Sequence, residues 1–250
     1  MSPPLHNEWT VHEVEWSPMQ VKRFWDALSG LSASADQYFT HQVGDALLRA
    51  TSPWIDLRGR ILDYAAGRGY LARHLLEAGA GRVDCAEFSP ESLASIETLV
   101  GGHARYGAGF LVSEFPTTLP SASYDVAFLV ETAEHLDPPW RGKTFAELHR
   151  VLKPGARLVV TVPNAENLEK NKVLCPECGA RFHRIQHVAS FTSDTLTSEC
   201  ARAGFHALSC RAIDLEDWKP VSAFRRARRR LRTALLRPAP PHLVYIGTRS

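Results

Sequence analysis

The stretch ILDYAAGRGY, residues 61–70, decides the fold of this chain. Its apolar start is typical of a buried strand that ends at Asp63, and Gly67 and Gly69 open the helix that follows. Glycine is needed at such a turn when a ligand passes close to the backbone, because a Cβ would block the approach. The first N–H groups of a helix also suit an anionic group. The stretch therefore predicts a ligand-binding strand–loop–helix unit, although a plain tight turn has the same pattern.

Short apolar runs and helical patterns alternate on both sides of this loop. The expected strands cover residues 60–67, 82–88, 109–113, 124–131, 156–164, 205–215 and 242–250. The expected helices between them cover residues 70–79, 89–100, 141–155 and 190–204. Such alternation predicts an α/β fold with a doubly wound, mostly parallel sheet of seven strands.

The same reading divides the chain into parts. Two helices within residues 18–52 predict an N-terminal helical cap, residues 1–57, ahead of a ligand-binding domain at 58–250. Within that domain we expect a small metal-binding insert at 170–190 and an Arg-rich helix at 220–237.

The composition is that of an ordinary globular protein. Of the 250 residues 44% are hydrophobic and 22% are charged, and the net charge of +2 names no partner. The sequence has no secretory signal pattern and no run of about 18 apolar residues, so we expect a cytoplasmic protein with no membrane span. The five cysteines do not form a disulfide scaffold pattern.

Three motifs together resemble the class I S-adenosylmethionine-dependent methyltransferases, and more narrowly those that act on small molecules. They are ILDYAAGRGYLARHLLEAG (61–79), YDVAFLVETAEHL (124–136) and LHRVLKPGARLVVTVPN (148–164). The resemblance extends over about residues 58–215 and implies a Rossmann-like sheet with S-adenosylmethionine as methyl donor.

The resemblance also implies which residues hold the donor. Asp63, Gly67 and Gly69 should surround its methionine part, together with Ala65, where the family usually has glycine and the extra methyl narrows the pocket. Glu87, 24 residues beyond Asp63, should bind the ribose hydroxyls. It could equally be an ordinary surface acid.

Three further acids are implied at the same edge. Glu114 should face the adenine, and Glu131 should border both the donor and the acceptor. Glu134 and His135 follow the fourth strand, where the family's donor meets its acceptor. Glu131 and His135 are therefore the catalytic candidates, with His135 as the base for an acceptor hydroxyl. The alternative for His135 is a structural histidine at a helix start.

A dinucleotide oxidoreductase is the other reading of the glycine loop. Gly67-x-Gly69-x-x-Ala72 loosely fits that fingerprint. Asp63 at the strand end and the VLKPG turn, residues 151–155, favour the methyltransferase. We therefore predict in-line methyl transfer, most simply O-methylation of a small-molecule or sugar-type acceptor.

The segment CPECGARFHRIQH, residues 175–187, has the spacing of metal ligands. Cys175, Cys178, His183 and His187 predict a structural Zn²⁺ site, since two thiolates and two imidazoles complete a tetrahedron. The alternative is a reduced cysteine pair beside two incidental histidines. The zinc prediction carries a conflict, because His187 lies where relatives often place a pocket histidine and a zinc-bound imidazole is no free base.

The segment AFRRARRRLRTALLR, residues 223–237, predicts a basic helix. It could bind a phosphate-bearing acceptor, or it could be a solvated surface. With the zinc segment it could instead form a nucleic-acid-binding or nucleic-acid-methylating module. A DNA-reading finger needs about 12 residues between its cysteine and histidine pairs, and only residues 179–182 separate them here, which favours a small-molecule acceptor. The sequence predicts no oligomeric state.

Overall fold

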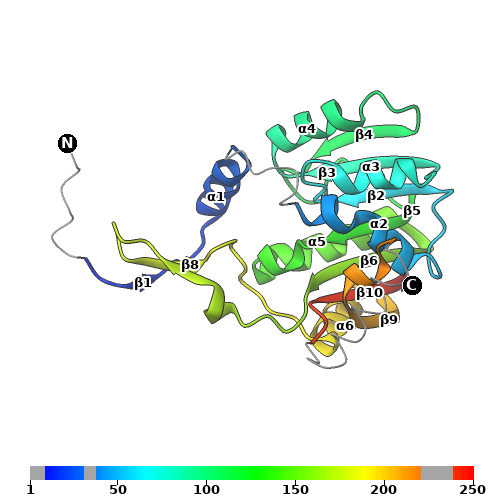
Figure 1. Cartoon of the computed structure of the whole chain (residues 1–250). Coiled ribbons are helices and arrows are strands. Elements are labelled where there is room, and N and C mark those ends of the chain that lie inside the picture. The colour runs from blue at the N-terminus through cyan, green and yellow to red at the C-terminus, as the bar shows by residue number, and fades with distance from the viewer. Residues whose placement is uncertain (1–8, 31–37, 221–238) are drawn as a thin grey trace.

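A computed structural model describes residues 9–30, 38–220 and 239–250 of the chain (Figure 1). The Arg-rich segment 223–237 lies outside the described residues, and so do parts of the predicted cap. Predictions about that segment stay predictions.

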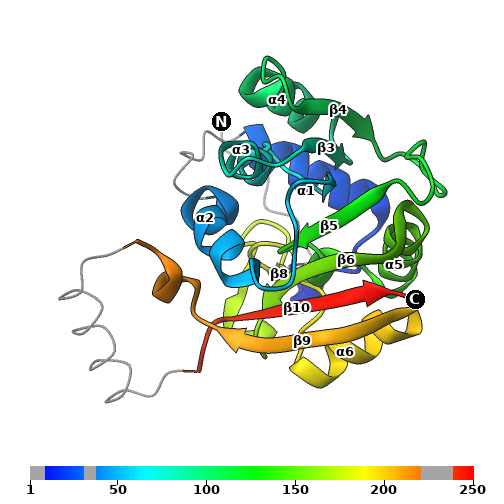
Figure 2. The same ribbon diagram turned by 90° about the vertical axis from the view of Figure 1, so that its right-hand side faces the viewer.

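A seven-stranded sheet forms the centre of the molecule. Its strands are β2 (Arg60–Tyr64), β3 (Arg82–Glu87), β4 (Tyr106–Leu111), β5 (Tyr124–Val130), β6 (Leu152–Pro163), β9 (Phe205–Ile213) and β10 (His242–Arg249). They lie in the order β4-β3-β2-β5-β6-β10-β9, and β10 runs antiparallel to both of its neighbours. Figure 2 shows β10 between β6 and β9. The predicted α/β fold with a mostly parallel seven-stranded sheet is confirmed.

Helices cover both faces of the sheet. They are α2 (Phe39–Thr51), α3 (Tyr70–Glu77), α4 (Pro90–Val100), α5 (Pro138–Val151) and α6 (Ser193–Arg202). Along β2, Ile61 belongs to the core cluster with α2, α3 and α4, and Leu62 to the cluster with α5 and α6. Successive strand residues face opposite sides, so a strand buried on both faces is apolar throughout.

The helix α2 lies inside this core. Val43, Ala46, Leu47 and Leu48 are buried in the same cluster as Ile61. The second helix of the predicted cap is therefore part of the packed domain, and the described part of the cap that stands apart is α1 (Pro18–Gly30).

Two helix ends illustrate what the local sequence determines. Ser89 caps α4 by accepting a hydrogen bond from the Ser92 N–H, with Pro90 in the first turn, as predicted. The helix α5 ends at Val151, earlier than predicted, and Leu152 already begins β6. The residue before a proline avoids the helical conformation, and here that residue is Lys153.

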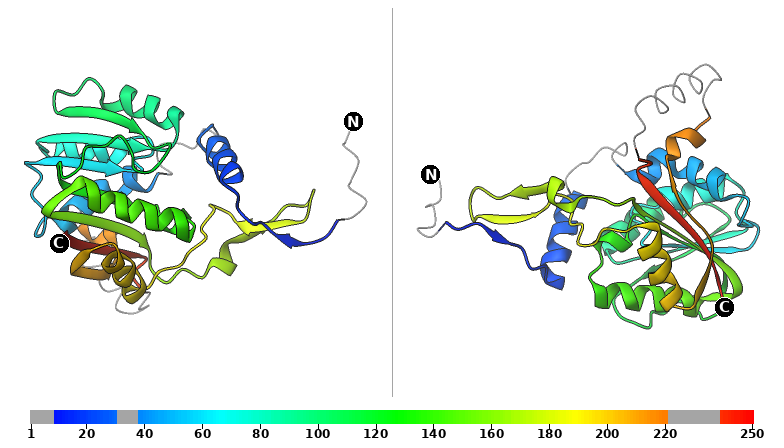
Figure 3. Two further views of the ribbon diagram at one scale, coloured as in Figure 1. Left: turned by 180° about the vertical axis from the view of Figure 1, so that it is seen from behind. Right: turned by 90° about the horizontal axis from the view of Figure 1, so that it is seen from below.

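A second, three-stranded sheet projects from the body (Figure 3). It consists of β1 (His12–Glu13), β8 (Ala180–His183) and β7 (Lys172–Leu174), in that order. We call it the arm, and the turn 175–179 its tip. The aromatic ring of Phe182 in β8 packs edge-on against Trp16 and against Phe24 of α1. Helix α1 lies between the arm and the body (Figure 1).

Three short 3-10 helices of the described chain connect the larger elements. Of these, η2 (Ala133–His135) follows β5, η3 (Leu168–Asn171) precedes the arm, and η4 (Leu215–Trp218) packs against α2. Among the described residues no helix is long and apolar enough to cross a membrane.

Candidate active site

The carboxyl ends of β2, β3, β5 and β6 meet at one edge of the sheet, where ligands of open α/β sheets bind. Backbone strain gathers at this edge. Ala65, Glu131, Ala165 and Gln186 all have φ between 45° and 60°, in the left-handed region that L-residues avoid. Strained residues of this kind cluster at functional sites, so the edge is the candidate active site.

The loop after β2 forms the first part of the site. Gly67 and Gly69 have φ of 56° and 83°, and Gly69 caps α3 in the left-handed conformation. Asp63 is 2% exposed, and its Oδ2 has no hydrogen-bond partner. Burial, and then the charge of Glu87, raises the pKa of Asp63 to about 7. A buried carboxyl with an unpaired oxygen is a ready partner for a cationic ligand group.

Glu87 lies opposite this loop, at the end of β3. Its carboxylate accepts hydrogen bonds from the N–H groups of Gly67 (2.7 Å), Phe88 (2.7 Å) and Ser89 (3.2 Å). Burial raises its pKa above the usual value for glutamate. A carboxylate has about four acceptor positions. Three of these positions are used here, which leaves one for a ligand. The hydrogen bond from the Gly67 N–H must therefore break for Glu87 to accept hydrogen bonds from both hydroxyls of a ribose.

These features fit S-adenosylmethionine. The unpaired Asp63 oxygen suits the ammonium of the methionine part, Glu87 suits the ribose, and the open backbone at Gly67 leaves room, since a Cβ there would meet nothing within 4 Å. Glu114 lies three residues past the end of β4 and is exposed. Its predicted contact with the adenine stays a prediction.

The predicted catalytic pair lies beyond the end of β5. The Glu131 N–H donates to the Thr161 carbonyl (3.0 Å), the Glu131 carboxylate accepts from the Thr161 hydroxyl (2.9 Å), and its second oxygen lies 3.6 Å from His242 Nδ1. Glu131 therefore joins β5 to β6 and β10.

His135 is enclosed by aromatic rings. The centroid of its ring lies 4.8 Å from that of Trp25 and 4.6 Å from that of His187. Burial, and then the neighbouring His187, lowers the pKa of His135 to about 3. Its Nδ1 has no partner. A ring that binds protons this weakly is a poor general base near neutral pH.

A glutamine bridge holds this wall together. Gln186 accepts a hydrogen bond from the Trp25 indole N–H (2.9 Å) and donates one to the His135 carbonyl (3.0 Å). The N–H groups of Val188 and Ala189 both donate to the Glu134 carbonyl. The cap helix α1, η2 and the loop 184–189 thus form one wall of the site.

A further acid–base pair lies at the same edge, and the sequence prediction did not include its acid, Glu166. His187 donates from Nδ1 to Glu166 Oε2 in a short hydrogen bond. Glu166 Oε1 accepts from His183 Nε2 (3.2 Å) and from the Asn171 amide (2.8 Å). Burial raises the pKa of Glu166, but the hydrogen bonds from His187 and Asn171 and the charges of His187 and His183 together outweigh it, and the net shift is downward. Glu166 is therefore an ionised carboxylate.

Glu134 completes the group. It is 1% exposed, both of its carboxyl oxygens lack partners, and one of them lies 4.0 Å from His187 Nε2. Burial raises its pKa well above the usual value, which favours the protonated, neutral form of the group. Glu166 could have been found from the sequence by one signal only, its place directly after the fifth strand of the domain.

The structure does not bring the four predicted zinc ligands together. Cys175 and Cys178 lie at the tip of the arm, whereas His183 ends β8 opposite Lys172 at its base. His183 lies three residues along β8 from Ala180, which directly follows the tip, and three strand residues span about 10 Å. Within the described ranges, the groups of three or more ligand atoms that lie within 4.8 Å of one another contain neither cysteine. One group is Glu166, His183 and His187, and the other is Glu134, His135 and His187.

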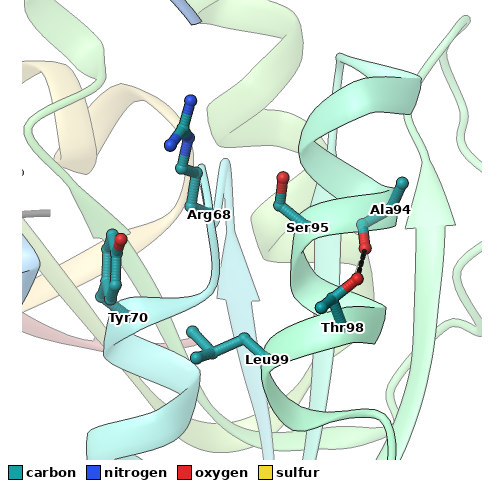
Figure 4. Close-up of a pocket in the computed structure, with 6 residues that line it drawn as sticks. All are labelled: Arg68, Tyr70, Ala94, Ser95, Thr98 and Leu99. Atoms are coloured by element: carbon teal, nitrogen blue, oxygen red, sulfur yellow. Dashed lines mark hydrogen bonds between the residues drawn. The ribbon is translucent and has the colours of Figure 1, made fainter. Parts of the chain in front are cut away.

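A separate hollow of about 460 Å³ lies between the helices α3 and α4 (Figure 4). Its lining residues are Arg68, Tyr70, Ala94, Ser95, Thr98 and Leu99. They include no carboxylate and no imidazole, so the hollow lacks the kind of acid–base pair that Glu166 and His187 form.

Comparison with known proteins shows the family to which the chain belongs. A family model of a methyltransferase domain matches residues 35–209. The chain belongs to the methyltransferase-domain family. It is an S-adenosylmethionine-dependent methyltransferase.

One curated relative and many solved structures are similar. A tRNA U34 carboxymethyltransferase from Methylococcus capsulatus is 30% identical over 185 residues, which are 68% of this chain and 54% of the relative. The chain thus spans about half the length of that relative.

The solved structures share the fold at low sequence identity. The putative methyltransferase found in a complex with the Haloferax volcanii Trm112 activator is 18% identical, with a TM-score of 0.64 over 91% of this chain and 96% of that one. A 1,6-didemethyltoxoflavin-N1-methyltransferase from Burkholderia thailandensis, solved with S-adenosylhomocysteine, is 19% identical, with a TM-score of 0.61 over 96% of this chain and 93% of that one.

Proposed function

We propose that this methyltransferase transfers the methyl group to a hydroxyl oxygen of a small-molecule acceptor, and that His187 removes the hydroxyl proton. The observation that carries the proposal is the hydrogen bond between His187 Nδ1 and Glu166. Methylation of a neutral hydroxyl must release a proton, and a base placed to accept it is worth roughly 10²–10⁴-fold in rate.

The partner of His187 decides which nitrogen can act. An ionised carboxylate only accepts hydrogen bonds, so Glu166 requires the proton of His187 to be on Nδ1. The other nitrogen, Nε2, is then left with a lone pair. A carboxylate that orients a histidine in this way also stabilises the imidazolium that forms when the proton arrives. This makes His187 a better base than His135.

The residues around the site have distinct tasks. When bound, S-adenosylmethionine supplies a methyl carbon that its sulfonium already activates. Asp63 and Glu87 would hold the donor from the sheet edge. The wall of Trp25, His135 and Gln186 would enclose the acceptor and exclude water. Holding the reacting atoms on one line can contribute roughly 7–11 kcal/mol.

Glu134 would orient the acceptor. As a neutral acid it can donate a hydrogen bond while His187 Nε2, 4.0 Å away, accepts one. Two such groups side by side suit an acceptor whose hydroxyl has a second oxygen beside it. Without a ligand, the unpaired carboxyl costs roughly 1–3 kcal/mol per unsatisfied group, which an acceptor would recover.

A nucleic-acid acceptor is the second candidate, because the curated relative is by name a tRNA carboxymethyltransferase. Charge favours the small molecule. The carboxylates of Glu87 and Glu166 give the edge a negative charge that repels phosphate. On the arm, Lys172 and Arg181 are each paired with both Glu13 and Glu169, which leaves little of their charge for a phosphate backbone.

A screen of two acceptor pools tests the proposal. The purified enzyme is incubated with S-adenosylmethionine and either a small-metabolite extract or bulk tRNA, and formation of S-adenosylhomocysteine is followed. We expect turnover with the extract and a product methylated on oxygen. Turnover with tRNA alone, or a product methylated on nitrogen or carbon, would contradict the proposal.

A further inference from the structure

The tip of the arm is a tight, fixed turn that holds two cysteines side by side. The Cys175 N–H donates to the Ala180 carbonyl (2.8 Å), and the Gly179 N–H donates to the Cys175 carbonyl (3.0 Å). Gly179 has φ of 77°, and a Cβ there would overlap the Thr10 carbonyl oxygen. The turn therefore requires glycine at this position, and β1 packs directly against it.

The two thiols lie within hydrogen-bonding distance of each other. The Cys175 thiol also accepts hydrogen bonds from the backbone N–H groups of Cys178 and Glu177. Neither cysteine forms a disulfide, and Cys178 is exposed. Two adjacent thiols with this backbone support are half of a tetrahedral zinc site.

The two histidines of the same segment do not supply the other half. His183 uses both ring nitrogens, since Nε2 contacts Glu166 and Nδ1 accepts from the His187 N–H. His187 is held by Glu166. Neither cysteine shares a cluster of three ligand atoms with any other potential ligand in the part of the chain that the structure describes.

Exposed apolar side chains lie beside the tip on both faces of the arm. The exposed fractions are 46% for Trp9, 56% for Val11 and 46% for Leu174, and Val173, which faces the opposite side from Leu174, is 40% exposed. All four lie on the arm or next to it, and the arm stands clear of the body (Figure 3). Exposed apolar side chains beside a projecting turn mark an interaction surface.

We propose that the arm tips of two copies of this chain meet around a two-fold axis and bind one zinc ion between them. Cys175 and Cys178 of each copy supply the four thiolates of a closed, structural site. A two-fold axis places the same patch on both sides, so the apolar residues beside each tip pack against their equivalents. The proposal concerns assembly and is independent of the acceptor and of His187.

Metal content and mass in solution test the proposal together. The full chain is purified without chelator, its zinc is measured by elemental analysis, and its mass by light scattering. We expect one zinc ion per two chains in a dimer, and monomers after the zinc is removed by a chelator. One zinc ion per monomeric chain, a dimer without zinc, or no zinc at all would each overturn it.

Matched variants locate the site. Cys178→Ser should abolish zinc binding and weaken dimerisation at least tenfold, whereas Cys210→Ser, which changes a half-buried thiol on β9, should leave both unchanged. Leu174→Arg should weaken the dimer, because it replaces one of the apolar side chains beside the tip with a charged one. His183→Ala should keep its zinc; loss of zinc from that variant would instead support a site formed within one chain. Binding of S-adenosylhomocysteine by every variant checks that the domain is folded.

Discussion

Replacement of Glu166 by glutamine is the sharpest perturbation of the proposed catalytic pair. Glu166→Gln keeps the size of the side chain and one acceptor oxygen, but it removes the charge that receives the His187 Nδ1 proton. A hydrogen bond to a charged group is worth roughly 1.5–3 kcal/mol. If that energy is used in the transition state, where His187 becomes charged, kcat should fall about 10- to 150-fold. The affinity for the donor should not change, because Glu166 lies on the acceptor side.

Two assays check this prediction. Steady-state kinetics on the acceptor found by the screen should give a lower kcat with an unchanged dissociation constant for S-adenosylhomocysteine. Nitrogen NMR of the imidazoles needs no acceptor: His187 should carry its proton on Nδ1 in the wild type and on a mixture of both nitrogens in the variant. Glu169→Gln is the matched control, since Glu169 forms only surface ion pairs three residues further on. Equal kcat for Glu166→Gln and the wild type, or a wild-type His187 protonated on Nε2, would refute the reasoning.

Three further perturbations test other parts of the site. Ala65→Gly relieves the left-handed conformation of an alanine, a conformation that costs roughly 1–2 kcal/mol. Glycine also raises the entropy of the unfolded chain, which destabilises the fold by roughly 0.4–1 kcal/mol, so denaturant unfolding should find the variant as stable as the wild type or more stable. The control Ala66→Gly, where φ is not positive, should lose stability, and equal losses in both variants would contradict the strain at Ala65. Glu87→Ala should weaken donor binding about 10- to 150-fold in calorimetry, because it removes roughly 1.5–3 kcal/mol of hydrogen bonds to a charged acceptor; an unchanged affinity would remove Glu87 from the site. Because the folded pKa of Asp63 is raised to about 7 from 3.8, the free enzyme should lose stability as pH rises from about 4 to 7. Over pH 5 to 7 S-adenosylhomocysteine should bind more tightly as pH rises, because its ammonium pairs with the ionised form of Asp63. Asp63→Asn should flatten both pH dependences, and pH profiles identical to those of the wild type would contradict the role of Asp63.

The fold could be predicted from the sequence because each of its signals is local. Strand ends are marked by Asp63 and Glu87, the turn by Gly67 and Gly69, and the start of α4 by Ser89, all within a few residues of the element they define. The periodicity of α2 was read correctly as a helix. It could not tell a cap helix from a core helix, because both bury one apolar face.

The acid–base pair could not be predicted in the same way. Glu166 and His187 are 21 residues apart, with the whole hairpin of the arm between them, and only the return of the chain to the sheet brings them together. The zinc prediction assumed that Cys178 and His183, close in sequence, are close in space. An extended strand rises about 3.3 Å per residue, so β8 separates the thiols from the imidazoles. The spacing of the four residues alone does not distinguish a compact zinc-binding turn from an extended hairpin.

The central claim is that His187 is the base for methyl transfer to oxygen, and a single variant tests it most directly. In His187→Asn the amide nitrogen can still donate to Glu166 from about the position of Nδ1, but the side chain has no second nitrogen to accept a proton. Single-turnover methyl transfer from bound S-adenosylmethionine to the acceptor is measured for the variant and the wild type at saturating concentrations of both substrates. The account predicts a rate lowered by roughly 10²–10⁴-fold with donor affinity unchanged. A rate within threefold of the wild type would contradict it.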